Sequence, residues 1–128
     1  MVNNVKGKLV KLVDSSLAFV HLTDDIRGRK VLDRHSEEIG TIDALYIDDK
    51  ERKVRFIRVA SGGILGIGKT TFLIPAAAIV KTTGEAVHID LTRTRVAKAP
   101  IFDPDLVEEN ELQNLYRHYG YLPYWGSV

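Results

Sequence analysis

The sequence contains no cysteine, which excludes disulfide bonds, thiol nucleophiles and zinc–thiolate sites. No apolar run approaches the roughly 18 residues that a membrane-spanning helix needs. The segment 1–14 lacks the continuous apolar stretch and the small-residue cleavage site of a secretory signal peptide. We therefore expect a cytoplasmic protein that has no membrane span.

An excess of charge of either sign is also missing, because 18 Lys/Arg oppose 17 Asp/Glu for a formal net charge of +1. The two parts of the chain differ, since residues 1–100 carry a net charge of +5 and residues 101–128 carry −4. This balance does not indicate a nucleic-acid-binding protein. An acidic tail docked on a basic body and a solvated polar surface both account for it.

Short apolar runs separated by turn residues dominate the first 100 positions. Six or seven strands are predicted, at residues 17–22, 30–33, 41–47, 54–59, 71–74, 79–81 and 85–91. In the last of them the alternation predicts that Val87, Ile89 and Leu91 point inward. Strands this short and closely spaced, with no long helix between them, predict a mainly β fold, either a small antiparallel barrel or a sandwich.

Towards its end the chain is predicted to become helical. Residues 92–99 allow two helical turns. Farther on, four side chains recur at helical spacing, namely Leu112, Leu115, Tyr116 and Tyr119. Asn110 and Gln113 resemble a capping box at the start of this helix, and Gly120 is expected to end it. The aromatic segment 121–125 then predicts an extended tail.

One motif resembles the phosphate-binding P-loop. Residues 63–70, GILGIGKT, match the pattern G-x-x-x-x-G-K-[ST], which binds phosphate only between a strand and a helix. The residues after Lys69 are β-branched, aromatic or aliphatic, so they predict a strand. Pro75 would also interrupt the helix that a P-loop needs. Nucleotide binding at this segment is therefore the least favoured function.

The same segment is expected to form a glycine-rich loop between two strands. Its glycines permit a tight backbone reversal, and Pro75 ends the strand that follows. These glycines are Gly62, Gly63, Gly66 and Gly68. Three apolar residues lie among them, namely Ile64, Leu65 and Ile67. Exposed, they would form a patch of the kind that contacts other proteins; folded over the mouth of a barrel, they would belong to the core. The sequence leaves both arrangements open.

No pattern of side chains indicates catalysis, a cofactor or a metal ion, so we expect a protein that is not an enzyme. The histidines lie far apart without ligand spacing; they are His21, His35, His88 and His118. The aspartate pairs 24–25 and 48–49 fall in predicted turns, where aspartate accepts backbone hydrogen bonds. Two basic clusters, within 27–30 and 50–58, are expected to be solvated faces, with phosphate contact as the alternative.

The order of several short motifs resembles that of the PRC-barrel domain family. The similar segments are IRGRKVLD (26–33), EIGTI (38–42), DALYID (43–48), FLIP (72–75), VHID (87–90) and KAPIFD (98–103). The glycine-rich loop before FLIP is similar to the glycine loop of the family. The chain departs from the family pattern at residues 76–78, where three alanines stand in place of a common tryptophan. The resemblance covers about residues 17–104.

The resemblance implies a small antiparallel β-barrel that acts by contact rather than by catalysis. Such barrels occur in the cytoplasmic part of the photosynthetic reaction centre H subunit and, in a related form, in a ribosome maturation factor that binds a ribosomal protein. On this basis we divide the chain into an N-terminal extension (1–16), a PRC-barrel domain (17–104) and a C-terminal helix with an aromatic tail (105–128).

We therefore expect a non-catalytic adaptor that binds a partner protein or a second copy of itself as a homo-oligomer, in an assembly related to that of the H subunit. The alternative is an assembly factor for ribosome or RNA processing that acts through residues 53–58. Besides the apolar residues of the glycine loop, the expected contacts are Tyr121, Tyr124 and Trp125. Tyr119 and Leu122 are expected instead to pack on the barrel of their own chain. For Trp125 the sequence leaves both arrangements open, packing on the barrel and contact with a partner.

Overall fold

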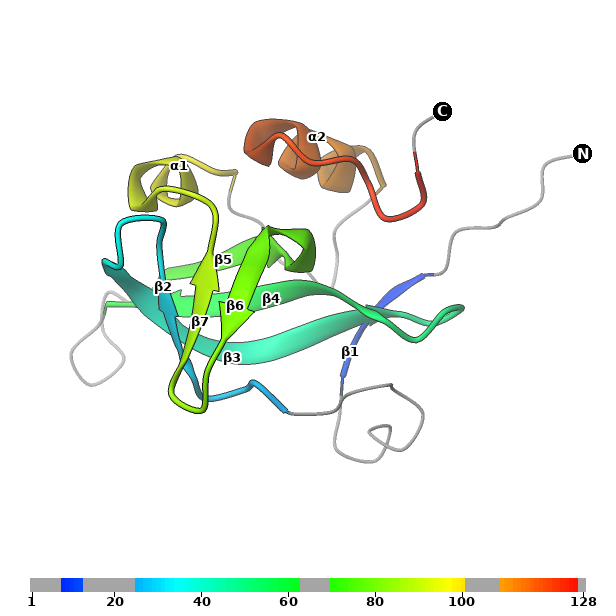
Figure 1. Ribbon diagram of the computed structural model, residues 1–128. Helices are drawn as coiled ribbons and strands as arrows, with labels where there is room; N and C mark the ends of the chain where they lie inside the picture. The colour runs from blue at the N-terminus through cyan, green and yellow to red at the C-terminus, as the bar shows by residue number, and fades with distance from the viewer. Residues whose placement is uncertain (1–7, 13–24, 63–69, 101–108, 127–128) are drawn as a thin grey trace, which may run out of the picture.

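The computed structural model describes residues 8–12, 25–62, 70–100 and 109–126 (Figure 1). Seven strands form one sheet, namely β1 (Leu9–Lys11), β2 (Lys30–Leu32), β3 (Glu38–Asp48), β4 (Val54–Ser61), β5 (Thr70–Pro75), β6 (Ile79–Thr82) and β7 (Ala86–Ile89). Their order is β5-β4-β3-β2-β7-β6, with β1 also paired to β3. The pairs are antiparallel except β2 with β7, which is parallel. The predicted mainly β fold is confirmed, with one parallel pair in it.

The sheet curls because its two end strands are neighbours in the chain. β5 and β6 stand at opposite ends of the strand order, yet the three-residue 3-10 helix η2 (Ala76–Ala78) joins them. The Asp90 N–H donates a hydrogen bond of 2.8 Å to the carbonyl of Ala78, which fastens this connection to the end of β7. A connection this short brings both ends of the sheet to one corner, as the curled sheet in Figure 1 shows.

The long strand β3 organises the sheet. One of its edges pairs with β4, and the other pairs with β2 near the start of the strand and with β1 near its end. A Cβ atom built on Gly40 would lie 2.1 Å from the carbonyl oxygen of Ala60 in β4. The close approach of the two strands at this point therefore requires glycine.

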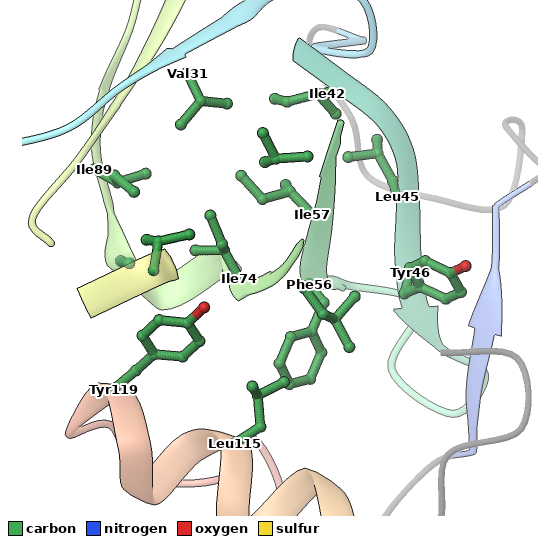
Figure 2. Close-up of a cluster of buried hydrophobic side chains, with 14 of the residues drawn as sticks. Val31, Ile42, Leu45, Tyr46, Phe56, Ile57, Ile74, Ile89, Leu115 and Tyr119 are labelled. Carbon is green, nitrogen blue, oxygen red and sulfur yellow. The ribbon is translucent and has the colours of Figure 1, made fainter. Parts of the chain in front are cut away.

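The core lies within the curled sheet and beneath two helices, α1 (Arg93–Ala97) and α2 (Glu109–Tyr119). Figure 2 shows Val31, Ile42 and Ile57 pointing towards one another from three different strands. α2 adds a stripe of buried side chains, namely Leu112, Leu115, Tyr116 and Tyr119. In Figure 2, Leu115 lies beside Phe56 of β4. The helix predicted from the spacing of these residues thus covers one side of the barrel core.

Local hydrogen bonds explain where α1 begins and where α2 ends. The Thr92 side chain accepts a hydrogen bond of 3.1 Å from the Arg95 N–H and caps α1. After α2, Gly120 has a φ of +80°. The Tyr121 N–H then donates to the carbonyl of Tyr116 at 3.0 Å, as in a Schellman motif. Gly120 is thereby confirmed as the residue that stops the helix.

Some local expectations differ from the structure. Asn110 lies within α2, so the predicted capping box is wrong, and the acidic residues of the first turn favour the helix start instead. The helix predicted at 92–99 is present but spans only Arg93–Ala97. β1 falls in the segment treated as an extension, yet it pairs with the end of β3. The strand predicted at 17–22 lies outside the described residues.

Candidate binding surface

The chain reverses after α2 and returns alongside it. The left-handed backbone at Gly120 makes the turn, and residues 121–126 then run back past the helix (Figure 1). Trp125 of this tail meets Tyr116 of α2 edge-on, with the ring centroids 6.0 Å apart. The tail is therefore held against the helix rather than projecting from it.

A series of ring contacts connects the tail to the barrel. The ring of Phe56 in β4 lies 4.9 Å from that of Tyr116, measured between centroids. Beyond Tyr116 comes Trp125, which in turn packs edge-on against Tyr124 at 5.0 Å. Tilted and edge-on pairs of this kind each add about 0.5–1.5 kcal/mol to the stabilisation from burial. The tail is thus ordered by the same aromatic cluster that seats α2.

Arg55 fixes the far end of this cluster. Its guanidinium carbon lies 5.1 Å from the centroid of the Tyr124 ring, a cation–π distance. The same side chain donates from Nε to Oδ2 of Asp48 at 2.7 Å and from Nη2 to Oε1 of Glu51 at 2.5 Å. Because two carboxylates orient the guanidinium, Tyr124 packs on a rigid support.

Asp48 is buried and supplies that support. Its Oδ1 accepts hydrogen bonds from the N–H groups of Lys50 and Glu51, and its Oδ2 accepts from Arg55. Burial alone would raise the pKa of Asp48, but the Glu51 N–H and the Arg55 guanidinium outweigh burial and lower it. The predicted turn role of Asp48 is confirmed, and the side chain also stabilises the tail through Arg55.

The phenol groups of the surface are held neutral. Burial raises the pKa of Tyr116, although a hydrogen bond from the Tyr124 backbone partly offsets the effect. Burial and the nearby Asp48 carboxylate raise the pKa of Tyr124 to about 12. Both hydroxyl groups are therefore protonated at physiological pH and act as hydrogen-bond donors or acceptors rather than as acids.

Between α2 and the tail lies a groove of about 330 Å³. Its lining consists of Gln113, Tyr116, Arg117, Tyr121, Leu122, Pro123, Trp125 and Gly126. Leu122 is 72% exposed, and the described residues contain one other large hydrophobic side chain with comparable exposure, Val80 at 65%. An aromatic floor with an exposed aliphatic rim and two polar side chains suits an apolar side chain from a partner.

Comparison with protein-family models identifies the family to which the fold belongs. The model of the PRC-barrel domain matches residues 20–96. The chain belongs to this family. No curated protein matches the sequence significantly. The match ends before α2, so the groove of this PRC-barrel protein lies on a part of the chain that the family model does not cover.

The structure brings the predicted tail contacts of this PRC-barrel protein together. Tyr121, Tyr124 and Trp125 are all half-buried, and two of them line the groove. Tyr119 is 2% exposed, so its predicted packing on the barrel is confirmed. Leu122 was expected to pack in the same way, and this is wrong: the reversal at Gly120 leaves its side chain facing solvent.

The glycine-rich loop is described only at its ends. Gly62 has a φ of +71°, which agrees with its predicted part in a reversal, and Pro75 is the buried last residue of β5. The predicted strand after Lys69 is present as β5, so the context that a P-loop needs is absent there. The predicted contacts Ile64, Leu65 and Ile67 and the glycines Gly63, Gly66 and Gly68 lie outside the described residues.

Two arginines of the basic strand are less exposed than the predicted solvated face requires. Arg55 and Arg58 are half-buried, with side chains 18% and 21% exposed. Arg58 donates from Nε to Oδ1 of Asp43 at 2.7 Å. Since Arg55 also binds carboxylates, the charge of β4 is largely neutralised by β3 and the turn between the two strands.

Asp33 was not singled out from the sequence. It is buried, and its Oδ1 accepts from the N–H groups of His35 and Glu37 at 2.8 and 2.9 Å. Its Oδ2 accepts from the Arg93 N–H at 2.8 Å, which joins the turn after β2 to the start of α1. Burial alone would raise the pKa of Asp33, but these donors together lower it. An aspartate at the end of a predicted strand, next to a polar turn, was the available signal.

Across the described ranges, no group of three or more histidine and acidic side chains gathers closely enough to bind a metal ion. None of the helices in those ranges is both long and apolar enough to span a bilayer.

Proposed function

We propose that this PRC-barrel protein is a non-catalytic protein-binding module that holds a partner through α2 and the tail. The observation that carries the proposal is the exposed Leu122 beside a preformed aromatic groove. Burying a leucine side chain contributes about 1.5–3 kcal/mol to association. Aromatic residues around such a side chain are the common anchors of protein interfaces.

The tail is suited to this role because it is ordered before a partner arrives. Tyr124 packs on Arg55, and Trp125 packs on Tyr116. Binding to a preformed surface avoids the entropy cost of ordering side chains and backbone at the interface. The surface therefore supports tighter binding than a disordered aromatic tail of the same composition.

The two buried carboxylates support a non-catalytic role. The oxygens of Asp33 accept three backbone hydrogen bonds, and those of Asp48 bind two backbone groups and Arg55. Their lowered pKa values keep both groups ionised at neutral pH, where they stabilise turns. A general acid would need a raised pKa and access to a substrate.

Two kinds of assembly fit the family, one related to the reaction-centre H subunit and one that processes ribosomes or RNA. The ion pairs of Arg55 and Arg58 favour the first, because they leave little positive charge on β4 for phosphate. The cytoplasmic location expected from the sequence belongs to the same proposal. Binding that weakens steeply with salt would favour the ribosomal assembly instead.

Affinity capture from native lysate tests the proposal with a matched pair of variants. Leu122→Asp places a charge beside the groove, whereas Val80→Asp makes the same change at the other exposed aliphatic residue, on β6. We expect the parent chain and Val80→Asp to retain one partner and Leu122→Asp to lose it. Equal recovery by all three chains, or recovery by none, would overturn the proposal.

A further inference from the structure

The groove between α2 and the tail carries charge of one sign. Among the described residues that line it, the charged one is Arg117, and the others are aromatic, aliphatic or neutral. We infer that the occupant of the groove is an extended protein segment in which an acidic side chain lies two residues from an apolar one. The inference rests on the proposed function and names the chemistry of the partner.

Arg117 is an exposed cation that meets no carboxylate among the described residues. Its Nη1 donates a hydrogen bond of 3.0 Å to the neutral amide oxygen of Asn114. Other arginines of the protein pair with carboxylates, namely Arg27, Arg34, Arg55, Arg58 and Arg93. A guanidinium presents its N–H donors in a planar fork that matches a carboxylate. Arg117 is therefore suited to a carboxylate that the partner supplies.

A second guanidinium adds positive charge near the end of α2. Arg95 of α1 is exposed, and its Nη1 lies 3.9 Å from the position that a Cβ atom on Gly120 would take. Within the described ranges, no carboxylate forms an ion pair with Arg95 either. Two cations where the chain reverses into the tail attract an acidic segment and repel a basic one.

Gln113 gives the groove a group that can hold an extended backbone. It lines the groove and stands four residues before Arg117, so the two side chains lie on the same face of α2. A carboxamide donates and accepts hydrogen bonds, as the N–H and C=O groups of a peptide require. Four residues span about 6 Å along a helix, close to the roughly 6.6 Å between alternate residues of a strand. Such alternate residues point the same way, so both enter one groove.

The apolar side chain of the segment has a defined place beside these polar groups. Tyr116 and Trp125 meet edge-on with ring centroids 6.0 Å apart, and both line the groove. Leu122 is exposed on the rim. The volume of about 330 Å³ lies at the lower end of the roughly 300–1,000 Å³ typical of ligand sites. It suits a short segment with one apolar anchor.

Selection from a phage-displayed library of random linear peptides, with the full chain as bait, tests the class of ligand. We expect the selected peptides to share an apolar residue with aspartate or glutamate two positions away. Trp125 is the one tryptophan of the chain and lines the groove, so its fluorescence reports a tryptophan-free synthetic peptide that binds there. Selected peptides that lack the acidic residue, or that bind without changing this fluorescence, would overturn the inference.

A reversal of charge at position 117 tests the part assigned to Arg117. Arg117→Gln should weaken the binding of a selected peptide about 3- to 10-fold. Arg117→Glu should reverse the preference, so that a peptide with lysine in place of its acidic residue binds more tightly than the original. Lys98→Glu makes the same change of charge at an exposed residue at the end of α1 and should keep the original preference. Equal weakening of both peptides by Arg117→Glu would contradict a direct contact.

The two proposals can fail separately. If the library yields no peptide, yet the chain captures a protein or a second copy of itself through Leu122, the acidic segment is wrong and the protein-binding function stands. If the library yields no peptide and the chain captures nothing, both are wrong.

Discussion

The hydroxyl group of Tyr119 is buried in the core without a hydrogen-bond partner in the described structure. Figure 2 shows it directed towards Ile74, among aliphatic side chains. A buried polar group left in this state costs about 1–3 kcal/mol. The ring of Tyr119 therefore stabilises the core through its apolar area, whereas its hydroxyl opposes that stabilisation.

We predict that Tyr119→Phe leaves the free energy of unfolding unchanged or raises it by about 1 kcal/mol. Urea denaturation followed by circular dichroism measures the change. Tyr116→Phe is the control on the same helix, because the Tyr116 hydroxyl accepts a hydrogen bond from the Tyr124 backbone. That control should lose about 1 kcal/mol. A clear loss of stability in Tyr119→Phe would show that its hydroxyl has a partner after all.

Asp33 makes stability depend on pH. Its pKa in the folded protein lies below the ordinary value of 3.8. A lowered folded-state pKa gives stability that is present above about pH 4 and is lost as the pH falls through the folded pKa. Asp48 shifts in the same direction, so both carboxylates contribute to unfolding in acid.

We therefore predict that Asp33→Asn lowers the free energy of unfolding by about 1–3 kcal/mol at pH 7, because the amide cannot accept all three backbone hydrogen bonds. The difference from the parent should shrink in acid, as the pH falls through the lowered pKa of Asp33 and the group itself becomes protonated. Asp90→Asn, at an exposed carboxylate that pairs with Arg34, should change stability by less than about 1 kcal/mol. A loss in Asp33→Asn that stays the same as the pH is lowered from 7 into the acid range would contradict the role of ionisation.

At the scale of elements, the pairing of β3 with β4 depends on Gly40. A Cβ atom there would lie 2.1 Å from the Ala60 oxygen and 2.8 Å from the Ala60 carbonyl carbon. Both atoms belong to the backbone of β4, so a side-chain rotation cannot relieve the overlap. The strands would have to separate at the point where their hydrogen bonds hold the sheet together.

We predict that Gly40→Ala lowers the free energy of unfolding by about 1–3 kcal/mol or more, the range seen for overpacking. Gly84→Ala is the matched control, because a Cβ atom at Gly84 has no neighbour within 4 Å. It should change stability by less than about 0.5 kcal/mol. Thermal unfolding of the two variants side by side gives the comparison, and equal midpoints would show that the strands can shift without cost.

The elements that the sequence predicted well are those with a clear period. Val87, Ile89 and Leu91 alternate and are all buried, and the helical spacing of α2 reproduces its buried face. Two features of the sheet could not be predicted from the sequence, for physical reasons. β1 has three residues, too few for a period. The parallel pairing of β2 with β7 depends on contacts between distant segments, which no local pattern records.

The binding surface was predictable only in part. Aromatic composition pointed to Tyr121, Tyr124 and Trp125, which the structure places together. The exposure of Leu122 depends on the direction that the chain takes after Gly120. From the sequence alone, an apolar residue next to aromatic ones is equally compatible with a buried position.

In the whole molecule, the part of the chain that packs into one core extends beyond the segment that the family model matches. The family model ends at residue 96, whereas the core includes four buried side chains of α2. Burial of the two leucines contributes about 1.5–3 kcal/mol each and the two tyrosine rings add to this, so the helix contributes an amount comparable with the 5–15 kcal/mol by which a typical domain is stable. The barrel should therefore depend on α2, although the tail beyond it adds mainly a surface.

We predict that residues 1–104 alone do not fold cooperatively, whereas residues 1–121 do. The longer fragment keeps α2 and the Tyr121 N–H that closes its last turn, and it loses Tyr124 and Trp125. It should show a single cooperative transition by circular dichroism and no binding of a partner in lysate. The shorter fragment should show a broad transition and bind an apolar dye. Equal cooperativity of the two fragments would mean that α2 packs on a barrel that is complete without it, and the dependence of the core on the helix would then be wrong.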